Sequence, residues 1–164
     1  MYRVLLVEDE PLILEGLCMA TPWARYGCTV AGKAYNAEEA ERLIVELRPD
    51  IVITDINMPG GSGLELIERM KGRCGCEFII LSGYDQFEYA KKAVFLGVKG
   101  YILKPLDEEE LRTVLESAIR SLEQKRAGAQ PALVYNEGNT TAERYLQRAC
   151  AWMEEHCDEQ ITLR

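Results

Sequence analysis

Five short apolar segments, each followed by a stretch with helical periodicity, most constrain what this 164-residue chain can fold into. They are Val4–Val7, Cys28–Ala31, Ile51–Thr54, Phe78–Leu81 and Tyr101–Leu103. Several are apolar at consecutive positions, which is typical of parallel strands covered by helices on both faces. Repeated strand–helix units with short loops form right-handed crossovers in one open sheet. The pattern therefore predicts an α/β domain over residues 1–125, with a doubly wound five-stranded parallel sheet of the (βα)5 type.

The starts of four predicted helices are marked by residue pairs at capping-box spacing, in which a short polar side chain precedes a Glu by three positions. The pairs are Asn36 with Glu39, Ser62 with Glu65, Asp85 with Glu88, and Asp107 with Glu110. The clearest helix follows the last pair. Its apolar stripe recurs at helical spacing through Leu111, Val114, Leu115, Ala118, Ile119 and Leu122. Gly97 and Gly100 bracket the turn before the fifth strand.

Charge and hydropathy narrow the possible partners and the compartment. The chain has 19 Lys and Arg against 27 Asp and Glu, a net charge of −8, so we expect it to bind nucleic acid poorly by itself. The longest apolar run, Ala149–Met153, is far shorter than the roughly 18 to 20 residues that cross a bilayer. The first apolar strand begins too early to leave room for a signal peptide. These features predict a cytoplasmic protein without a membrane partner.

The six cysteines are scattered, and a chain of this size can bury a core without disulfides. We interpret them as reduced thiols, mostly small core residues. Cys74-Gly75-Cys76 has the form of half a metal site. However, no second cysteine pair follows at metal-site spacing, and the only histidine, His156, is distant in sequence. Buried thiols are therefore favoured over a metal centre.

Polar residues follow four of the five predicted strands. Glu8 and Asp9 come after the first strand, Asp55 after the third, Ser82 after the fourth and Lys104 after the fifth. Sites in open α/β sheets form at the carboxyl ends of the strands, where the strand order reverses. Each residue alone could be a helix cap or a solvated surface group. Their joint occurrence at one sheet edge instead predicts a functional site.

The predicted cluster of three carboxylates requires cations. Two carboxylates about 4 Å apart repel by roughly 4 kcal/mol at an effective dielectric constant near 20. Mg²⁺, a hard ion that prefers oxygen ligands and phosphate, would balance this charge together with Lys104. A carboxylate can itself attack phosphorus and form an acyl phosphate. The cluster therefore indicates Mg²⁺-dependent phosphoryl transfer, with Ser82 and Lys104 at the phosphoryl oxygens.

Four motifs in these segments closely resemble the receiver domain of two-component response regulators. The motifs are Val7–Glu10, Asp55–Pro59, Leu81–Tyr84 and Tyr101–Pro105. The resemblance covers essentially all of residues 1–125. It implies a CheY-like, flavodoxin-like fold. It also implies a signalling switch rather than an enzyme with a separate substrate, phosphorylated by a histidine kinase in order to control transcription.

The same resemblance assigns roles to individual residues. It makes Asp55 the phosphoacceptor, and it places Mg²⁺ on Glu8, Asp9, Asp55 and the backbone carbonyl of Asn57. Ser82 would be the hydroxyl switch, Tyr101 the aromatic switch that moves inward behind it, and Lys104 a contact of the phosphoryl group. Gly83 would leave space for that group, and the Lys104–Pro105 bond would be cis. Phosphorylation would favour a homodimer through the fourth helix, fifth strand and fifth helix.

The C-terminal part carries a second resemblance. Residues 126–139 have linker composition, and Leu146, Ala149, Cys150, Met153 and Cys157 fall on one helical face. Leu146–Cys157 with Ile161–Leu163 resembles the opening of an AraC-type helix-turn-helix domain, so residues 140–164 would be the first helix of a truncated domain. The alternative is a generic amphipathic helix. We expect DNA binding only by a longer parent protein, because this segment is net acidic and has no recognition helix.

Three other functions fit the residues less well. A phosphohydrolase with an aspartyl nucleophile commonly has a second Asp two residues later, where this chain has Asn57. A flavin-binding carrier of the same topology would need a Ser-, Thr- or Gly-rich loop after the first strand, but residues 8–11 are Glu-Asp-Glu-Pro. A receiver that had lost phosphorylation would lack some of the expected residues, and all are present.

Overall fold

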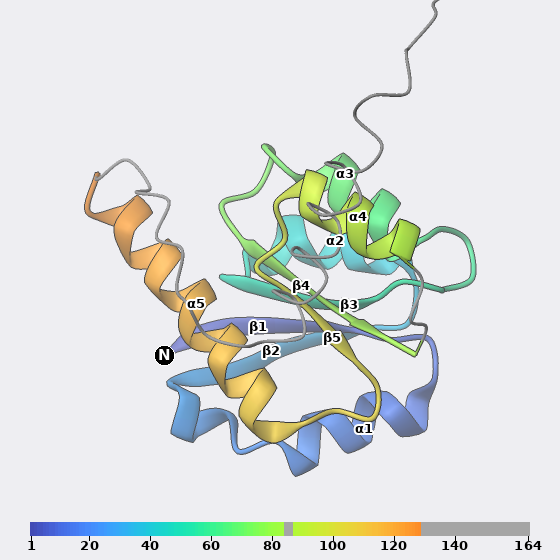
Figure 1. Cartoon of the computed structure of the whole chain (residues 1–164), viewed down its shortest axis with the longest axis horizontal. Helices are drawn as coiled ribbons and strands as arrows, with labels where there is room; N and C mark the ends of the chain where they lie inside the picture. The colour runs from blue at the N-terminus through green and yellow to red at the C-terminus, as the bar shows by residue number, and fades with distance from the viewer. Residues whose placement is uncertain (84–86, 129–164) are drawn as a thin grey trace, which may run out of the picture.

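The fold is a single parallel sheet between two layers of helices (Figure 1). It is seen in a computed structural model, which describes residues 1–83 and 87–128. The strands are β1 (Tyr2–Val7), β2 (Cys28–Ala34), β3 (Ile51–Asp55), β4 (Glu77–Ser82) and β5 (Gly100–Leu103). They pair in parallel in the order β2-β1-β3-β4-β5. The predicted doubly wound α/β fold is confirmed.

The helices cover both faces of this sheet. They are α1 (Pro11–Ala20), α2 (Ala37–Leu47), α3 (Gly63–Met70), α4 (Phe87–Leu96) and α5 (Glu108–Arg126), with a short 3-10 helix η1 (Trp23–Tyr26) after α1. Helices α1 and α5 lie on one face, and α2, α3 and α4 lie on the other (Figure 1). The strand order reverses between β1 and β3, so a crevice is expected at their carboxyl ends.

The two hydrophobic cores explain why the strands are apolar at consecutive positions. Leu5, Val52 and Ile80 pack under α2, α3 and α4, whereas their neighbours Leu6, Ile53 and Ile79 pack under α1 and α5. Successive side chains of a strand point to opposite faces, and both faces are covered here. The predicted stripe of α5 also faces the second core, where Ile119 is the one member that is only partly buried.

Three of the predicted helix starts are confirmed by hydrogen bonds. The side chains of Asn36, Ser62 and Asp107 each accept a bond from a backbone N–H in the first turn of their helix, at 2.8–3.1 Å. Only Ser62 completes a reciprocal capping box, because the Glu65 carboxylate accepts from its backbone N–H. The fourth predicted cap, Asp85, lies outside the described residues.

The structure extends all five predicted strands: β1 begins at Tyr2, β3 ends at Asp55, β4 spans Glu77–Ser82, and β2 and β5 are also longer than predicted. Strand β2 continues to Ala34 rather than ending at Ala31, since an edge strand keeps its pairing with β1 through the partly exposed Gly32 and Lys33. Gly100 is the first residue of β5 instead of a turn residue. Helix α5 ends at Arg126, just past the predicted domain boundary.

Several predictions fall mainly or wholly outside the described residues. They are the linker over 126–139, the helix-turn-helix segment over 140–164, and the placement of Cys150, Cys157 and His156. Within the described part, no helix combines the length and the apolar character needed to span a bilayer.

Candidate functional site

The predicted site residues meet at the carboxyl edge of the sheet. Glu8 follows β1, Asp55 is the last residue of β3, Ser82 ends β4, and Lys104 follows β5. Strands β1, β3, β4 and β5 are successive neighbours in the sheet. The parallel arrangement therefore places these four residues at the same edge of the sheet, as the sequence predicts.

Three carboxylates form the acidic part of the site. Glu8, Asp9 and Asp55 each offer an oxygen atom, and these atoms lie within 4.8 Å of one another. Glu8 is 3% exposed and Asp55 is 8% exposed, so water screens their repulsion poorly. Such a group is stable only if cations compensate it.

Lys104 supplies one compensating charge. Its Nζ lies 2.6 Å from Oε2 of Glu8 and 3.2 Å from Oδ1 of Asp55. The backbone N–H of Lys104 donates to the carbonyl of Ser82 at 2.8 Å, which holds the lysine at the end of β4. The Lys104–Pro105 peptide bond is cis.

Burial and the local charges shift the pKa values of this ion pair. Burial raises the pKa of Glu8 above its ordinary value, and the negative charge of Asp55 adds to that effect, while Lys104 opposes both. For Lys104, burial alone lowers the pKa. The hydrogen bond to Glu8 and the charges of Asp55 and Glu8 outweigh it, so the lysine pKa is raised and the ammonium stays charged.

The backbone around Asp55 is held by close contacts. The backbone N–H of Asn57 donates to Oδ2 of Asp55 at 3.0 Å, and the N–H of Gly63 donates to the carbonyl of Ile56 at 2.8 Å. A Cβ atom on Gly63 would collide with the carbonyl oxygen of Asp55. Gly63 therefore positions Asp55, and sequence reasoning missed it. The available signal was a glycine in the first turn of a helix, where other residues are favoured.

The residues expected to act as switches are mostly buried. Ser82 is buried at the end of β4. Tyr101, which is 4% exposed, packs in the core under α2, α3 and α4. Tyr101 already lies inside the protein in this structure, so an inward movement is not needed to bury it.

Gly83 is exposed, and a Cβ there would meet no atom within 4 Å. The predicted need for a glycine at 83 can therefore concern only a bound phosphoryl group.

A comparison with protein families shows to which family this fold belongs. Residues 4–116 match the response regulator receiver domain. The chain belongs to the response regulator receiver family. The predicted family is thus confirmed, and with it a signalling domain rather than a conventional enzyme.

Relatives of this receiver include transcriptional regulators. It is 44% identical over 126 residues to the uncharacterized transcriptional regulatory protein YesN of Bacillus subtilis, covering 76% of this chain and 34% of YesN. It is 38% identical over 122 residues to the transcriptional regulatory protein HptR of Staphylococcus aureus, covering 74% of this chain and 48% of HptR. The chain therefore spans between a third and half of these curated relatives.

A solved structure supports the same assignment. The receiver resembles the REC domain of AraT, a response regulator from Geobacillus stearothermophilus, with a TM-score of 0.69 and 35% identity. The match covers 76% of this chain and 98% of the AraT domain. The described sheet and helices thus correspond to a complete receiver fold.

The acidic cluster of this receiver fits a hard divalent cation. Its potential ligands are carboxylate oxygens, which Mg²⁺ prefers, and they converge from the ends of two neighbouring strands. Asp9 and Asn57 also line a shallow surface depression of about 510 Å³, which gives this edge access to solvent. The residues present are therefore compatible with the Mg²⁺ dependence that the sequence predicts.

Proposed function

We propose that this receiver accepts a phosphoryl group on Asp55 from a histidine kinase and thereby controls transcription through the remainder of a longer cytoplasmic protein. The single observation that supports this most is the position of the Asp55 carboxylate. It lies at the sheet edge, 3.2 Å from the Lys104 ammonium and beside Glu8 and Asp9. This is the environment that a carboxylate nucleophile for phosphorus requires.

The proposed chemistry is an in-line transfer. An Asp55 carboxylate oxygen attacks the phosphorus of a phosphohistidine, a P–O bond forms, and the P–N bond breaks as the imidazole leaves. Lys104 then contacts a phosphoryl oxygen and offsets the added negative charge. Glu8, Asp9, Asp55 and the carbonyl of Asn57 would hold Mg²⁺, which when bound neutralises charge on the transferring group.

The position of Asn57 favours a switch over a phosphohydrolase. Its backbone N–H donates to Oδ2 of Asp55, and its side chain is an amide rather than an acid. The site therefore has no acid at the position from which a leaving group would be protonated. Phosphoryl transfer onto Asp55, followed by hydrolysis, is the chemistry that these residues support.

The proposed response involves Ser82 and Tyr101. The hydroxyl of Ser82 would donate to a phosphoryl oxygen, and Tyr101 would be held in its buried position behind it.

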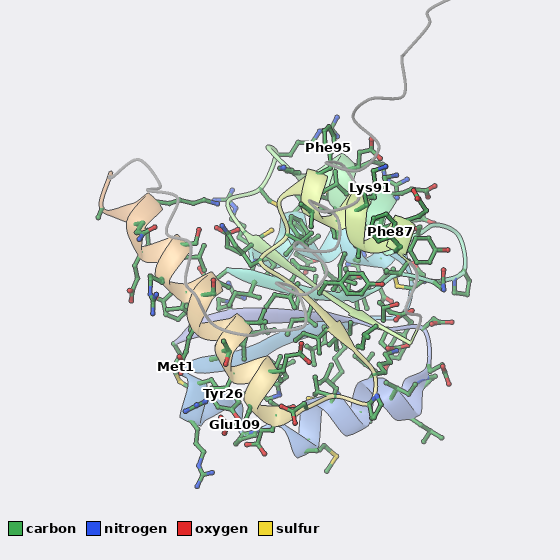
Figure 2. All side chains as sticks on the ribbon, in the orientation of Figure 1. Met1, Tyr26, Phe87, Lys91, Phe95 and Glu109 are labelled. Atoms are coloured by element: carbon green, nitrogen blue, oxygen red, sulfur yellow. The ribbon has the colours of Figure 1, made fainter. Side chains whose placement is uncertain are left out.

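The neighbouring helix α4 carries an 87% exposed Phe95 on its outer side (Figure 2). We propose that phosphorylation favours a homodimer through α4, β5 and α5. Sedimentation with and without a phosphate mimic tests this, and unchanged distributions would contradict it.

The output would reside in the remainder of the parent protein. The named relatives are transcriptional regulatory proteins, and this chain covers less than half of each. We propose that residues 126–139 are a linker and that residues 140–164 begin an AraC-type DNA-binding domain. The chain itself should not shift promoter DNA at low salt, whereas the parent should. Tight, salt-sensitive binding by residues 1–164 would contradict this.

The decisive experiment measures phosphorylation of Asp55. The chain is incubated with acetyl phosphate and Mg²⁺, and the mass of the intact protein is measured. We expect one phosphoryl group on the wild type and none on Asp55→Asn. Asp107→Asn is the matched control, because Asn caps a helix as well as Asp and should leave phosphorylation unchanged. No phosphoryl group on the wild type, or equal labelling of Asp55→Asn, would reject the proposal.

A further inference from the structure

The amino edge of the sheet, opposite the acidic cluster, carries a pair of thiols in contact. Cys74 and Cys76 lie in the loop between α3 and β4, and their Sγ atoms are 2.7 Å apart. Gly75 lies between them, and the chain bends at this glycine. The contact therefore arises from the local turn and does not depend on a distant element moving.

The two thiols differ in their access to solvent. Cys76 is buried, whereas Cys74 is half-buried and lines an open depression of about 1,060 Å³. This depression lies between α2, the α3–β4 loop and the end of α5. A small oxidant can therefore reach Cys74 directly, while Cys76 is accessible mainly through its neighbour.

The contact also makes the two thiols chemically unequal. The hydrogen bond from Cys76 lowers the pKa of Cys74 to about 6, and the positive charge of Lys125 contributes in the same direction. The same hydrogen bond and burial raise the pKa of Cys76. These opposite shifts favour the thiolate form of Cys74 with a thiol beside it, which is the arrangement of an attacking and a resolving cysteine.

The depression beside the pair is lined by charged side chains. Its basic lining residues are Arg42, Arg48, Arg73 and Arg126. The opposing carboxylates are those of Glu41, Glu46 and Asp50, together with Glu77 next to Cys76. Each of these four carboxylates forms an ion pair with an Arg or Lys side chain. Among residues 1–83 and 87–128, Arg48 and Arg73 form no ion pair, so the lining of this depression includes two arginines that no carboxylate neutralises.

A metal centre is the other use of such a pair, and the geometry disfavours it. Among the described residues, the only set of three His, Cys, Asp or Glu side chains close enough to share an ion is Glu8, Asp9 and Asp55. Structural zinc sites need four such ligands. The half metal site noted in the sequence thus gains no further ligand from the described fold.

We propose that Cys74 and Cys76 form a redox-active dithiol that a peroxide oxidises to an intramolecular disulfide. The Cys74 thiolate attacks one peroxide oxygen, the O–O bond breaks, and the leaving hydroxide takes up a proton to become water. Cys74 is then a sulfenic acid. The sulfur of Cys76 attacks the sulfur of Cys74, the S–O bond breaks, and a second water leaves with the proton of Cys76. Two thiols and one peroxide thus give one disulfide and two waters.

Oxidation of the full chain tests the proposal. The reduced protein is treated with hydrogen peroxide, alkylated, digested and mapped by mass spectrometry. We expect the peptide that holds Cys74 and Cys76 to lose two hydrogens and to resist alkylation until a reductant is added. Cys18→Ala is the control and should leave this disulfide unchanged. Peroxide that oxidises other cysteines while this pair stays alkylatable, or a disulfide from either residue to Cys150 or Cys157, would overturn the proposal.

A second measurement separates reactivity from mere proximity. In the reduced chain, alkylation of Cys74 should be half-maximal near the pKa of about 6. In Cys76→Ala and Cys76→Ser, the pH of half-maximal alkylation of Cys74 should rise toward the ordinary thiol pKa of about 8.5. Peroxide should then leave a sulfenic acid on Cys74 that dimedone traps. Buried Cys28, whose pKa is raised to about 11, serves as the unreactive reference. An unchanged midpoint in both variants would contradict the assigned pairing.

Discussion

The two ends of the sheet each bury one glutamate against a lysine, but among the described residues only the carboxyl end gathers further carboxylates around the pair. At the carboxyl end, Glu8 is 3% exposed and lies 2.6 Å from Nζ of Lys104. At the amino end, Glu77 is 4% exposed and lies 2.7 Å from Nζ of Lys125. The hydroxyl of Ser121 also donates to Glu77, at 2.8 Å. In exposed fraction and in distance to the partner lysine, the two glutamates are therefore nearly equivalent.

The difference lies in what surrounds each pair. Glu8 shares its lysine with Asp55 and has Asp9 close by, so three carboxylates converge near one ammonium. Glu77 has a lysine and a hydroxyl to itself, and its charge is balanced. Structural ion pairs also occur buried in proteins, so a buried pair by itself does not mark a functional site. The uncompensated negative charge at the carboxyl end is what indicates a site for a cation and a phosphoryl group.

The largest expected effect comes from removing the lysine at each end. Lys104→Met leaves the buried Glu8 and Asp55 uncompensated, and we expect the free energy of unfolding in EDTA at pH 7 to fall by about 3 kcal/mol. Lys125→Met should cost about 1 kcal/mol, because Ser121 still bonds Glu77 and half of the Lys125 side chain was exposed. Denaturant titrations measure both. Equal losses, or no recovery of Lys104→Met with Mg²⁺, would remove the distinction between the ends.

A smaller effect is expected from filling the space beside Asp55. Gly63→Ala forces a methyl group against the Asp55 carbonyl, and Gly100→Ala forces one against Val114 of α5. Each should lower the free energy of unfolding by about 2 kcal/mol through overpacking. Only Gly63→Ala should also slow phosphorylation by acetyl phosphate. Gly16→Ala, which meets no atom within 4 Å, is the control for both measurements. Equal slowing by both strained variants would show that general destabilisation, not the position of Asp55, is responsible.

The smallest expected effect comes from removing one negative charge at each end of the sheet. The resulting change in stability should have opposite signs at the two ends. Asp9→Ala relieves repulsion in the acidic cluster, so the metal-free protein should gain about 1 kcal/mol while its affinity for Mg²⁺ falls. Glu77→Gln removes a charge that is well paired, and stability should fall by about 1 kcal/mol with Mg²⁺ affinity unchanged. Thermal melting in EDTA and Mg²⁺ titration give the two readings. If both variants gain stability, or both lose it, then negative charge is not in excess at the carboxyl end alone.

Much of the fold was predictable because local signals agreed with the tertiary structure. The five apolar segments became the five strands, since consecutive apolar residues need cover on both faces. Asn36, Ser62 and Asp107 cap their helices as predicted, because a capping bond involves only residues within one turn. Where the local signal was weak, as at partly exposed Lys33 in the edge strand β2, the predicted boundary was short.

The sequence predicted which residues form the site, but it did not predict how their side chains are arranged. The sequence placed Glu8, Asp55 and Lys104 at one sheet edge, since parallel strands deliver their carboxyl ends together. The glycine at position 63 was visible in the sequence, but its close approach to the Asp55 carbonyl was not, because that approach depends on where α3 begins. The sequence also did not show that Tyr101 is buried in the core under α2, α3 and α4, because that depends on how these helices pack on the sheet.

The sequence by itself determined the sheet, the helix starts and the set of charged residues, because periodicity and capping depend on neighbours along the chain. Only the tertiary structure decided which lysine pairs with which glutamate, and that Cys76 is buried while Cys74 lines an open depression. Charge balance and thiol reactivity depend on distances of a few ångströms between side chains and on their exclusion from water. Those quantities exist only after the helices have packed on the sheet.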